Sequence, residues 1–204
     1  MINNKERVPM EHYTGRYAAA RPEELSARSG APFYDGAFHV TMLGQPLYAP
    51  WPEFSLKAEQ AACPGALLDS AARLLVIQFL LEGTSVPSSG KFLAYRELPW
   101  GEVYDKNFQG HCVRRLTSLF GSRPGELIRA AEKLGGAAFR AGDAAVELPL
   151  FEDVRIRLIL HAGDEEFPPT SQFLFSDNAS AAFTAEDLFA CGNIVISALK
   201  ACAE

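Results

Sequence analysis

Residues 144–161 contain two runs in which apolar and polar residues alternate, AAVELPL and VRIRLILH, separated by the short turn FED. Alternation with a period of two is typical of strands that bury one face, and the short turn predicts an antiparallel hairpin. If residue 150 faces residue 154, Glu147 comes opposite Arg157 on the exposed face and forms an ion pair with it. The buried face then carries Val146, Leu148, Ile156 and Leu158.

The remaining patterns predict a sheet and helices that do not alternate strictly along the chain. A proline-bearing strand in the first hairpin is predicted to lie at a sheet edge, and Thr184 with Asp187 predicts a capping box at the start of the last helix. We therefore predict an α+β fold in one domain, 1–204, with a mainly antiparallel sheet, a buried central helix and several amphipathic helices. The predicted elements are helices at 11–20 and 22–30, a hairpin at 37–51, the central helix at 64–83, a strand at 91–95, helices at 108–119 and 127–134, a strand at 171–177 and the helix from 184.

Charge and composition argue against several classes of partner. The net charge is -6 and the 19 basic residues form no run or stripe, which argues against nucleic acid. The longest apolar block, LLVIQFLL, is too short to span a bilayer, and the start has no apolar leader, so we expect a cytoplasmic protein without membrane contact. The cysteines are far apart, lack metal-ligand spacing and are expected to be reduced. They are Cys63, Cys112, Cys191 and Cys202.

Several catalytic signatures are absent from the sequence. It has no P-loop, no GxGxxG after a strand, no GxSxG and no HExxH. Nucleotide hydrolysis, dinucleotide-dependent redox chemistry, serine hydrolysis and zinc proteolysis therefore lose support.

The segment AYRELPWGEVYDKNF, residues 94–108, combines an arginine, acids and aromatic residues around a tight turn. Arg96 offers a planar fork for an anionic group, and Trp100 and Tyr104 offer flat walls, which is a usual combination in small-ligand pockets. Glu97 completes this set of predicted ligand-binding residues. The alternative is that Arg96 pairs with Glu97 or an aspartate and only stabilises the loop.

The segment HAGDEEFPP, residues 161–169, holds three consecutive acids, Asp164, Glu165 and Glu166, followed by Phe167. With Asp177 arriving after the next strand, Asp164 and Glu166 are candidate ligands for Mg²⁺, Ca²⁺ or Mn²⁺. His161 is a further weak metal candidate, or a base. The alternatives are a solvated acidic loop, or one acid that caps backbone N–H groups.

These two segments and several glycines resemble a domain-of-unknown-function family found mainly in anaerobic bacteria and archaea, over roughly residues 11–200. The resemblance implies no activity. Some relatives carry a preceding cysteine-rich iron–sulfur segment, which this chain lacks, so no cluster is expected on it. The resemblance also favours placing the two loops side by side, with Arg96 pairing an acid of the second. The residues that carry it are Gly90, Phe92, Arg96–Pro99, Gly101, Tyr104, Phe108, Gly135–Gly136, Gly142–Ala144, Gly163–Pro168, Phe175 and Asp177.

Three functions remain. The first is a small-molecule or cofactor-binding accessory domain of anaerobic metabolism, with Arg96 anchoring an anionic group and Trp100, Tyr104 and Phe167 as walls. The alternative is a protein–protein interaction module that uses an exposed apolar patch or the sheet edge near residues 46–50. The third is an enzyme with a carboxylate-bound divalent metal and His161 or Glu97 as base.

Overall fold

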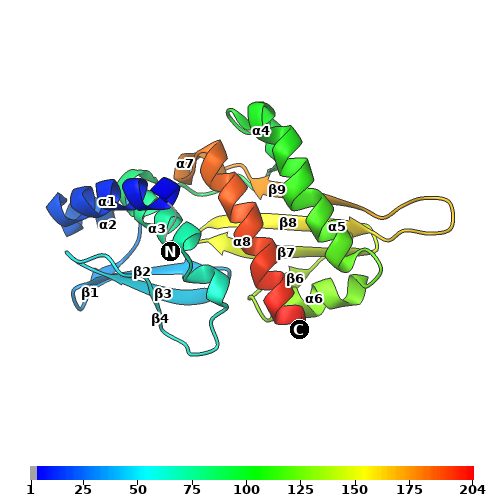
Figure 1. The fold of residues 1–204 in the computed structure, drawn as a ribbon, viewed down its shortest axis with the longest axis horizontal. Helices are drawn as coiled ribbons and strands as arrows, with labels where there is room; N and C mark the ends of the chain where they lie inside the picture. The colour runs from blue at the N-terminus through cyan, green and yellow to red at the C-terminus, as the bar shows by residue number, and fades with distance from the viewer. Residues whose placement is uncertain (1–3) are drawn as a thin grey trace.

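The structure is a computed structural model that describes residues 4–204, with side chains from Met10 onward, so residues 1–3 of the predicted domain lie outside it. Its fold is α+β, as predicted (Figure 1). In chain order the elements are α1 (Asn4–Ala19), α2 (Pro22–Ser29), β1 (Phe33–Tyr34), β2 (Ala37–Met42), β3 (Gln45–Pro50), β4 (Lys57–Ala58), a 3-10 turn (Gly65–Leu67), α3 (Ser70–Glu82), β5 (Phe92–Ala94), a 3-10 turn (Tyr95–Glu97), α4 (Gly101–Phe108), a π-helical segment (Gln109–Val113), α5 (Arg114–Phe120), α6 (Pro124–Glu132), β6 (Ala137–Ala138), β7 (Ala144–Phe151), β8 (Val154–His161), β9 (Thr170–Ser176), α7 (Ala179–Ala182) and α8 (Ala185–Ala203).

The strands form one sheet in the order β4-β3-β2-β7-β8-β9-β5, with β1 added beside β2 and β6 beside β7. The recorded strand pairs are antiparallel. The proline-bearing strand β3 was expected at the edge, but the two residues of β4 pair with its centre at Leu47 and Tyr48. A short outer strand therefore covers the part of that edge which the interaction-module hypothesis would have used.

The hairpin of β7 and β8 has the predicted register as far as Pro149 opposite Arg155, but the register shifts at the turn, where Phe151 and not Leu150 lies opposite Val154. Glu147 lies opposite Arg157, and Arg157 Nε donates a hydrogen bond to Glu147 Oε2 at 2.8 Å. The apolar residues predicted for the other face are all buried. The hairpin pattern thus determines which face of the sheet packs against the core.

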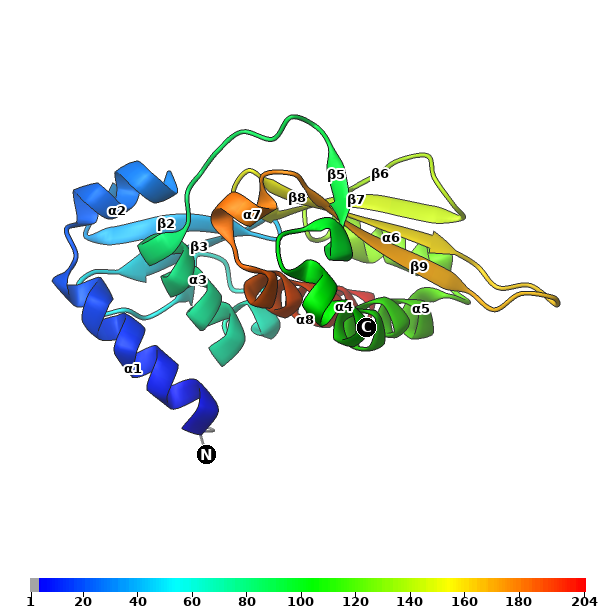
Figure 2. The same cartoon turned by 90° about the horizontal axis from the view of Figure 1, so that it is seen from above.

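The larger helices after β4 cover the buried face of this sheet, whereas α2 lies on the other side of β2 in Figure 2. Figure 2 shows α3, α4, α5 and α8 on one side of the sheet, while the segment that leads to β5 arches over the other side. The buried side chains of both layers belong to one hydrophobic cluster. Within the described residues, no helix combines the length and the apolar character that a membrane span requires.

The predicted starts of four helices differ from the structure; among them, α1 begins at Asn4 rather than at residue 11, and α6 at Pro124 rather than at residue 127. The central helix α3 begins at Ser70 rather than near Pro64, because the Asp69 carboxylate accepts a hydrogen bond from Ala72 N (2.9 Å) and caps the helix there. The helix predicted from Phe108 begins at Gly101 and continues through the π-helical segment into α5. Tyr104 is therefore a helical residue, not part of a turn.

Candidate functional site

The turn between β5 and α4 holds Trp100 away from the protein. Leu98 is buried, whereas the Trp100 side chain is 78 % exposed and its backbone is left-handed, with φ 63°. A non-glycine residue in that conformation is strained, typically by about 1–3 kcal/mol. Gly101 is required next, because any side chain there would overlap the carbonyl oxygen of Tyr95. The local backbone thus fixes an indole ring in solvent at an energetic cost.

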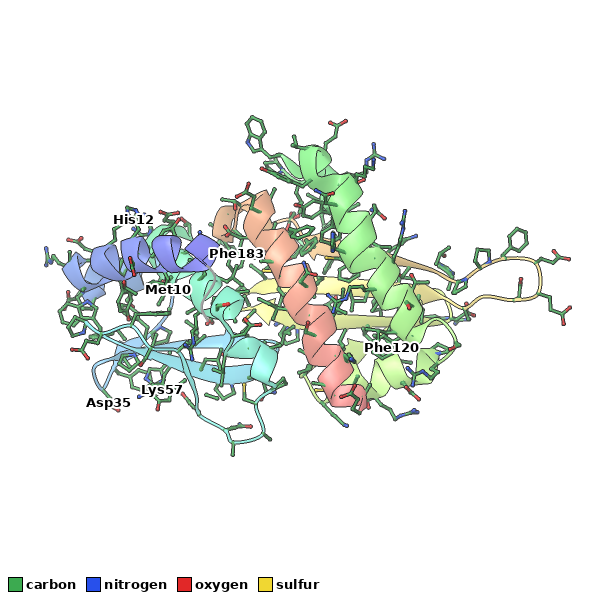
Figure 3. All side chains as sticks on the ribbon, viewed as in Figure 1. Met10, His12, Asp35, Lys57, Phe120 and Phe183 are labelled. Atoms are coloured by element: carbon green, nitrogen blue, oxygen red, sulfur yellow. The ribbon has the colours of Figure 1, made fainter. Side chains whose placement is uncertain are left out.

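Trp100 borders a cleft of about 300 Å³ that is lined by α3, the turn before α4, and the start of α8. Phe183, labelled in Figure 3, belongs to the lining and directly precedes the first turn of α8. The volume is at the lower end of the range for small-molecule sites. The lining residues are Gln78, Glu82, Leu98, Pro99, Trp100, Ser180–Ala185, Asp187 and Leu188.

The polar groups of the cleft are mainly acceptors. Asp187 forms the predicted capping box with Thr184, whose N and Oγ1 donate to Asp187 Oδ2 at 3.0 and 2.7 Å. Burial raises the pKa of Asp187, and Glu82 and Glu186 raise it further, against the lowering effect of Thr184. Glu82 accepts a 2.5 Å hydrogen bond from Arg16. The cleft therefore favours a ligand that donates hydrogen bonds.

Gln78 links Asp187 to Tyr13 of α1. Its neighbours are all satisfied when its amide nitrogen donates to Asp187 Oδ1 (3.2 Å) and its oxygen accepts from Tyr13 Oη (3.1 Å). Gln78 is the polar residue within the apolar block LLVIQFLL. Sequence reasoning missed Gln78, Glu82 and Asp187 as site residues, although a polar residue on a helix that is otherwise apolar was a usable signal.

Tyr104 and Glu97 stabilise the position of the Trp100 turn. Tyr104 Oη donates to Glu186 Oε1 at 2.6 Å and so ties α4 to α8, and this hydrogen bond raises the pKa of Tyr104. Glu97 Oε2 accepts from Ala94 N at 2.6 Å, within its own turn. Both predicted site residues therefore position the cleft wall.

Arg96 lies outside the cleft. It is exposed and borders a separate hollow of about 150 Å³ beside Gln109 and Ser171. The ion pairs recorded for residues 10–204 do not include Arg96, so neither Glu97 nor an aspartate neutralises it. The anionic group predicted to bind at Arg96 remains a prediction, separate from the Trp100 cleft.

The acidic loop at residues 161–169 matches the alternative in which one of its acids caps backbone N–H groups. Asp164 Oδ1 accepts from Glu166 N (2.9 Å) and Phe167 N (2.7 Å), and these bonds lower the pKa of Asp164. The side chains of Glu165 and Glu166 are exposed, and Phe167 is 67 % exposed. Asp164 therefore caps the turn of its own loop.

The predicted proximity of this loop to Arg96 is wrong. The loop projects beyond the sheet, far from the start of α4, in both Figure 1 and Figure 2. Ala94, two residues before Arg96, pairs with Leu174 of β9. Leu174 lies four residues after Thr170, the first residue of β9, where the acidic loop ends. At about 3.3 Å per strand residue this adds roughly 13 Å before the loop starts.

The predicted metal ligands do not converge either. Asp164 precedes β9 and Asp177 follows it, so the seven residues of the strand, roughly 23 Å, separate them. Asp177 instead accepts hydrogen bonds from the hydroxyls of Ser88 and Ser89, which lower its pKa. His161 is exposed at the end of β8. In the part of the chain that the structure describes, no three His, Cys, Asp or Glu residues form a group that could hold a metal ion.

Comparisons with known proteins give one match. A family described as "Domain of unknown function (DUF3786)" matches residues 21–198, an extent slightly shorter than the predicted 11–200. No curated protein and no solved structure matches the chain. Most of the α+β fold, including the Trp100 cleft, lies within the matched residues. The chain therefore belongs to the family of domains of unknown function that carries this description.

Proposed function

We propose that this protein is a small-molecule-binding domain whose ligand occupies the cleft between α3, the Trp100 turn and α8. The observation that carries the proposal is the exposed Trp100 ring at the rim of that cleft. Exposure of a large ring is unfavourable, and so is its left-handed backbone. A ligand that covers the ring explains why both costs are retained.

The chemistry of the lining limits the ligand. Glu82 and Asp187 offer carboxyl oxygens as hydrogen-bond acceptors, and Trp100 offers the face of an indole ring. Aromatic faces and carboxylates together favour a cationic or donor-rich group. The ligand therefore carries an amino group or several hydroxyl groups next to a flat apolar part.

Protein–protein interaction is the second candidate, because Val103 is 67 % exposed near Trp100. Together they place two apolar side chains at the start of α4, and tryptophan is enriched at the energetic centres of protein interfaces. Under this alternative, a partner protein covers Trp100 instead of a small molecule.

The role in anaerobic metabolism and the cytoplasmic location are part of the proposal. The four cysteines are free in the structure, which supports a reducing compartment. The enzyme hypothesis loses its support from a shared metal site, since Asp177 lies at the opposite end of β9 from Asp164 and Glu166.

The test is native mass spectrometry of the protein purified without oxygen, comparing the unmodified chain with Trp100→Gly. We expect a small-molecule adduct on the unmodified chain only. Glycine tolerates φ 63°, so relief of the backbone strain should offset the larger conformational entropy of the unfolded chain, and the variant should keep a stability close to that of the original chain. Unfolding in urea measures that stability.

Phe167→Ala is the matched control, because it removes another exposed ring from a different loop. It should keep the adduct. An unmodified chain without any adduct, or an adduct that persists in Trp100→Gly, contradicts the proposal. Copurification of a second protein that is lost in Trp100→Gly favours the interaction module.

A further inference from the structure

A second hollow, of about 390 Å³, lies on the face of the sheet opposite the helices. Its floor includes Arg155 and Arg157 of β8, and one wall is Phe92 at the start of β5. The segment that arches over this side in Figure 2 provides Pro87, Ser88 and Gly90 as another wall. The hollow is separate from the Trp100 cleft, since the two share no lining residue.

Arg157 is held rigidly in this hollow. Its guanidinium lies over the ring of Phe92, 3.8 Å from the centroid, and 4.9 Å from the centroid of Phe139. Its Nε donates to Glu147 Oε2 at 2.8 Å. Within residues 10–204, the two terminal nitrogens of Arg157 have no recorded hydrogen bond, so its outer donors are fixed in position and unused.

Arg155 adds a second guanidinium on the same face. It precedes Arg157 by two residues, which places the two Cα atoms about 7 Å apart along the strand. Only its backbone is engaged, with Arg155 N donating to Ser176 Oγ at 2.9 Å. Its side chain is exposed and has no recorded ion pair or hydrogen bond in the described part of the chain.

The arching segment is anchored beside these arginines. The Asp177 carboxylate binds Ser88 and Ser89, and Asp177 N donates to Lys91 O at 3.0 Å. These serine hydroxyls are therefore already engaged with Asp177. The wall is fixed, and the donors that remain for a ligand come from the arginines.

The formal charges of the lining balance, with Arg155 and Arg157 against Glu147 and Asp153, so an anion would be held by the free guanidinium N–H groups and not by a net positive charge. Glu147 neutralises Arg157 in part, and Asp153 at the rim has a weak contact with Ser85 Oγ, 3.5 Å away. The exposed residues Lys91 and Arg140 directly precede Phe92 and follow Phe139 in the sequence. A preorganised planar guanidinium with free terminal nitrogens binds carboxylate or phosphate oxygens through paired hydrogen bonds.

We propose that Arg155 and Arg157 form a binding site for a small molecule that carries a carboxylate or phosphate group beside a flat apolar part. The oxygens bind the free guanidinium nitrogens, and the flat part lies against Phe92. The site is independent of the ligand in the Trp100 cleft.

The test follows the Nε–H NMR signals of the full chain labelled with ¹⁵N-arginine during titration with benzoate, phenyl phosphate and inorganic phosphate. We expect saturable shifts of the Arg155 and Arg157 signals with benzoate, phenyl phosphate or both, and the stronger of the two identifies the anionic group. Inorganic phosphate should bind more weakly than the better aromatic probe, because it lacks the flat part.

Arg155→Ala should weaken binding of the better probe about tenfold or more, the loss expected for one charge-assisted contact. Arg157→Lys keeps the positive charge but loses the planar guanidinium group, so it should weaken binding of that probe by a similar factor. Arg73→Ala, an exposed arginine on α3, is the matched control and should bind as the original chain does.

The proposal is overturned if neither aromatic probe gives saturable shifts, or if Arg155→Ala binds as tightly as the original chain. Equal affinity for inorganic phosphate overturns the role of the flat part. Thermal melting checks the fold of each variant. If Arg157→Lys does not fold, Arg155→Ala decides the question, because its side chain has no recorded partner to lose.

Discussion

The Trp100 turn and the Asp164 loop look alike in sequence, but the structure gives them different roles. Each has acids next to an exposed aromatic ring, Trp100 in the first and Phe167 in the second. Behind Trp100 lies a cleft with the half-buried carboxyl group of Asp187, whereas Asp164 binds the backbone of its own loop. Whether a cluster of polar residues can hold a ligand therefore depends more on the structure that faces the cluster than on which residues the cluster contains.

The largest effect that tests this comparison is expected for Gly101→Ala. A Cβ atom at residue 101 would overlap the Tyr95 carbonyl oxygen, so the turn must rearrange. We expect a loss of about 2–4 kcal/mol in the free energy of unfolding, measured in urea, together with loss of the Trp100 orientation.

Gly110→Ala is the control for that change. A Cβ atom there has nothing within 4 Å, and the residue is helical. The variant should be unchanged or more stable by about 0.5–1 kcal/mol. If Gly101→Ala proves as stable as Gly110→Ala, the turn is not fixed by the close approach to Tyr95.

An effect of intermediate size is expected in how the protein's stability changes with pH as Asp187 and Asp164 titrate. The pKa of Asp187 is raised, mainly by burial, so its stabilising contribution is present below pH 3.8 and is lost as the pH rises through its folded-state value. The pKa of Asp164 is lowered by hydrogen bonds from Phe167 N and Glu166 N, so its contribution is lost as the pH falls through its folded-state value.

Carboxyl ¹³C NMR of the full chain measures both values directly. Asp187 should titrate above the usual aspartate range and Asp164 below it. Asp187→Asn cannot ionise, so it should lose the first pH dependence of stability and keep the second. Equal pKa values for the two acids would remove the electrostatic contrast between the sites.

The smallest effect is expected for Asp164→Ala. The loop projects from the sheet, so its loosening should leave the melting temperature unchanged and increase amide hydrogen exchange at Glu166 and Phe167. Asp164→Asn retains an acceptor oxygen and should stay close to the original chain. A large fall in melting temperature would show that the loop supports the core after all.

Local patterns sufficed wherever one interaction between near neighbours determines the structure. The alternation in residues 144–161 predicts both the buried face and the Glu147–Arg157 pair, because a shift of one residue would reverse every side chain. The capping box of Thr184 and Asp187 was predicted for the same reason, since its partners lie three residues apart.

The candidate site could not be predicted in this way. Its groups come from three distant parts of the chain, represented by Gln78, Trp100 and Asp187, and no pattern of spacing links them. The Arg96 turn and the Asp164 loop were placed together because both carry residues of the family resemblance, which does not fix positions in space. The carboxylates Asp164 and Asp177 were grouped as possible metal ligands, but strand length and direction put them at opposite ends of β9.

By itself the sequence determined the α+β class, the pairing of Glu147 with Arg157 in the β7–β8 hairpin and the start of the final helix, because these depend on side-chain period and short-range hydrogen bonds. Only the tertiary structure decided which polar residues meet. It brought Trp100 and the half-buried Asp187 to one cleft and placed Arg157 between Phe92 and Phe139, since packing α8 beside α4 and β5 beside β9 brings together groups that are remote in the chain.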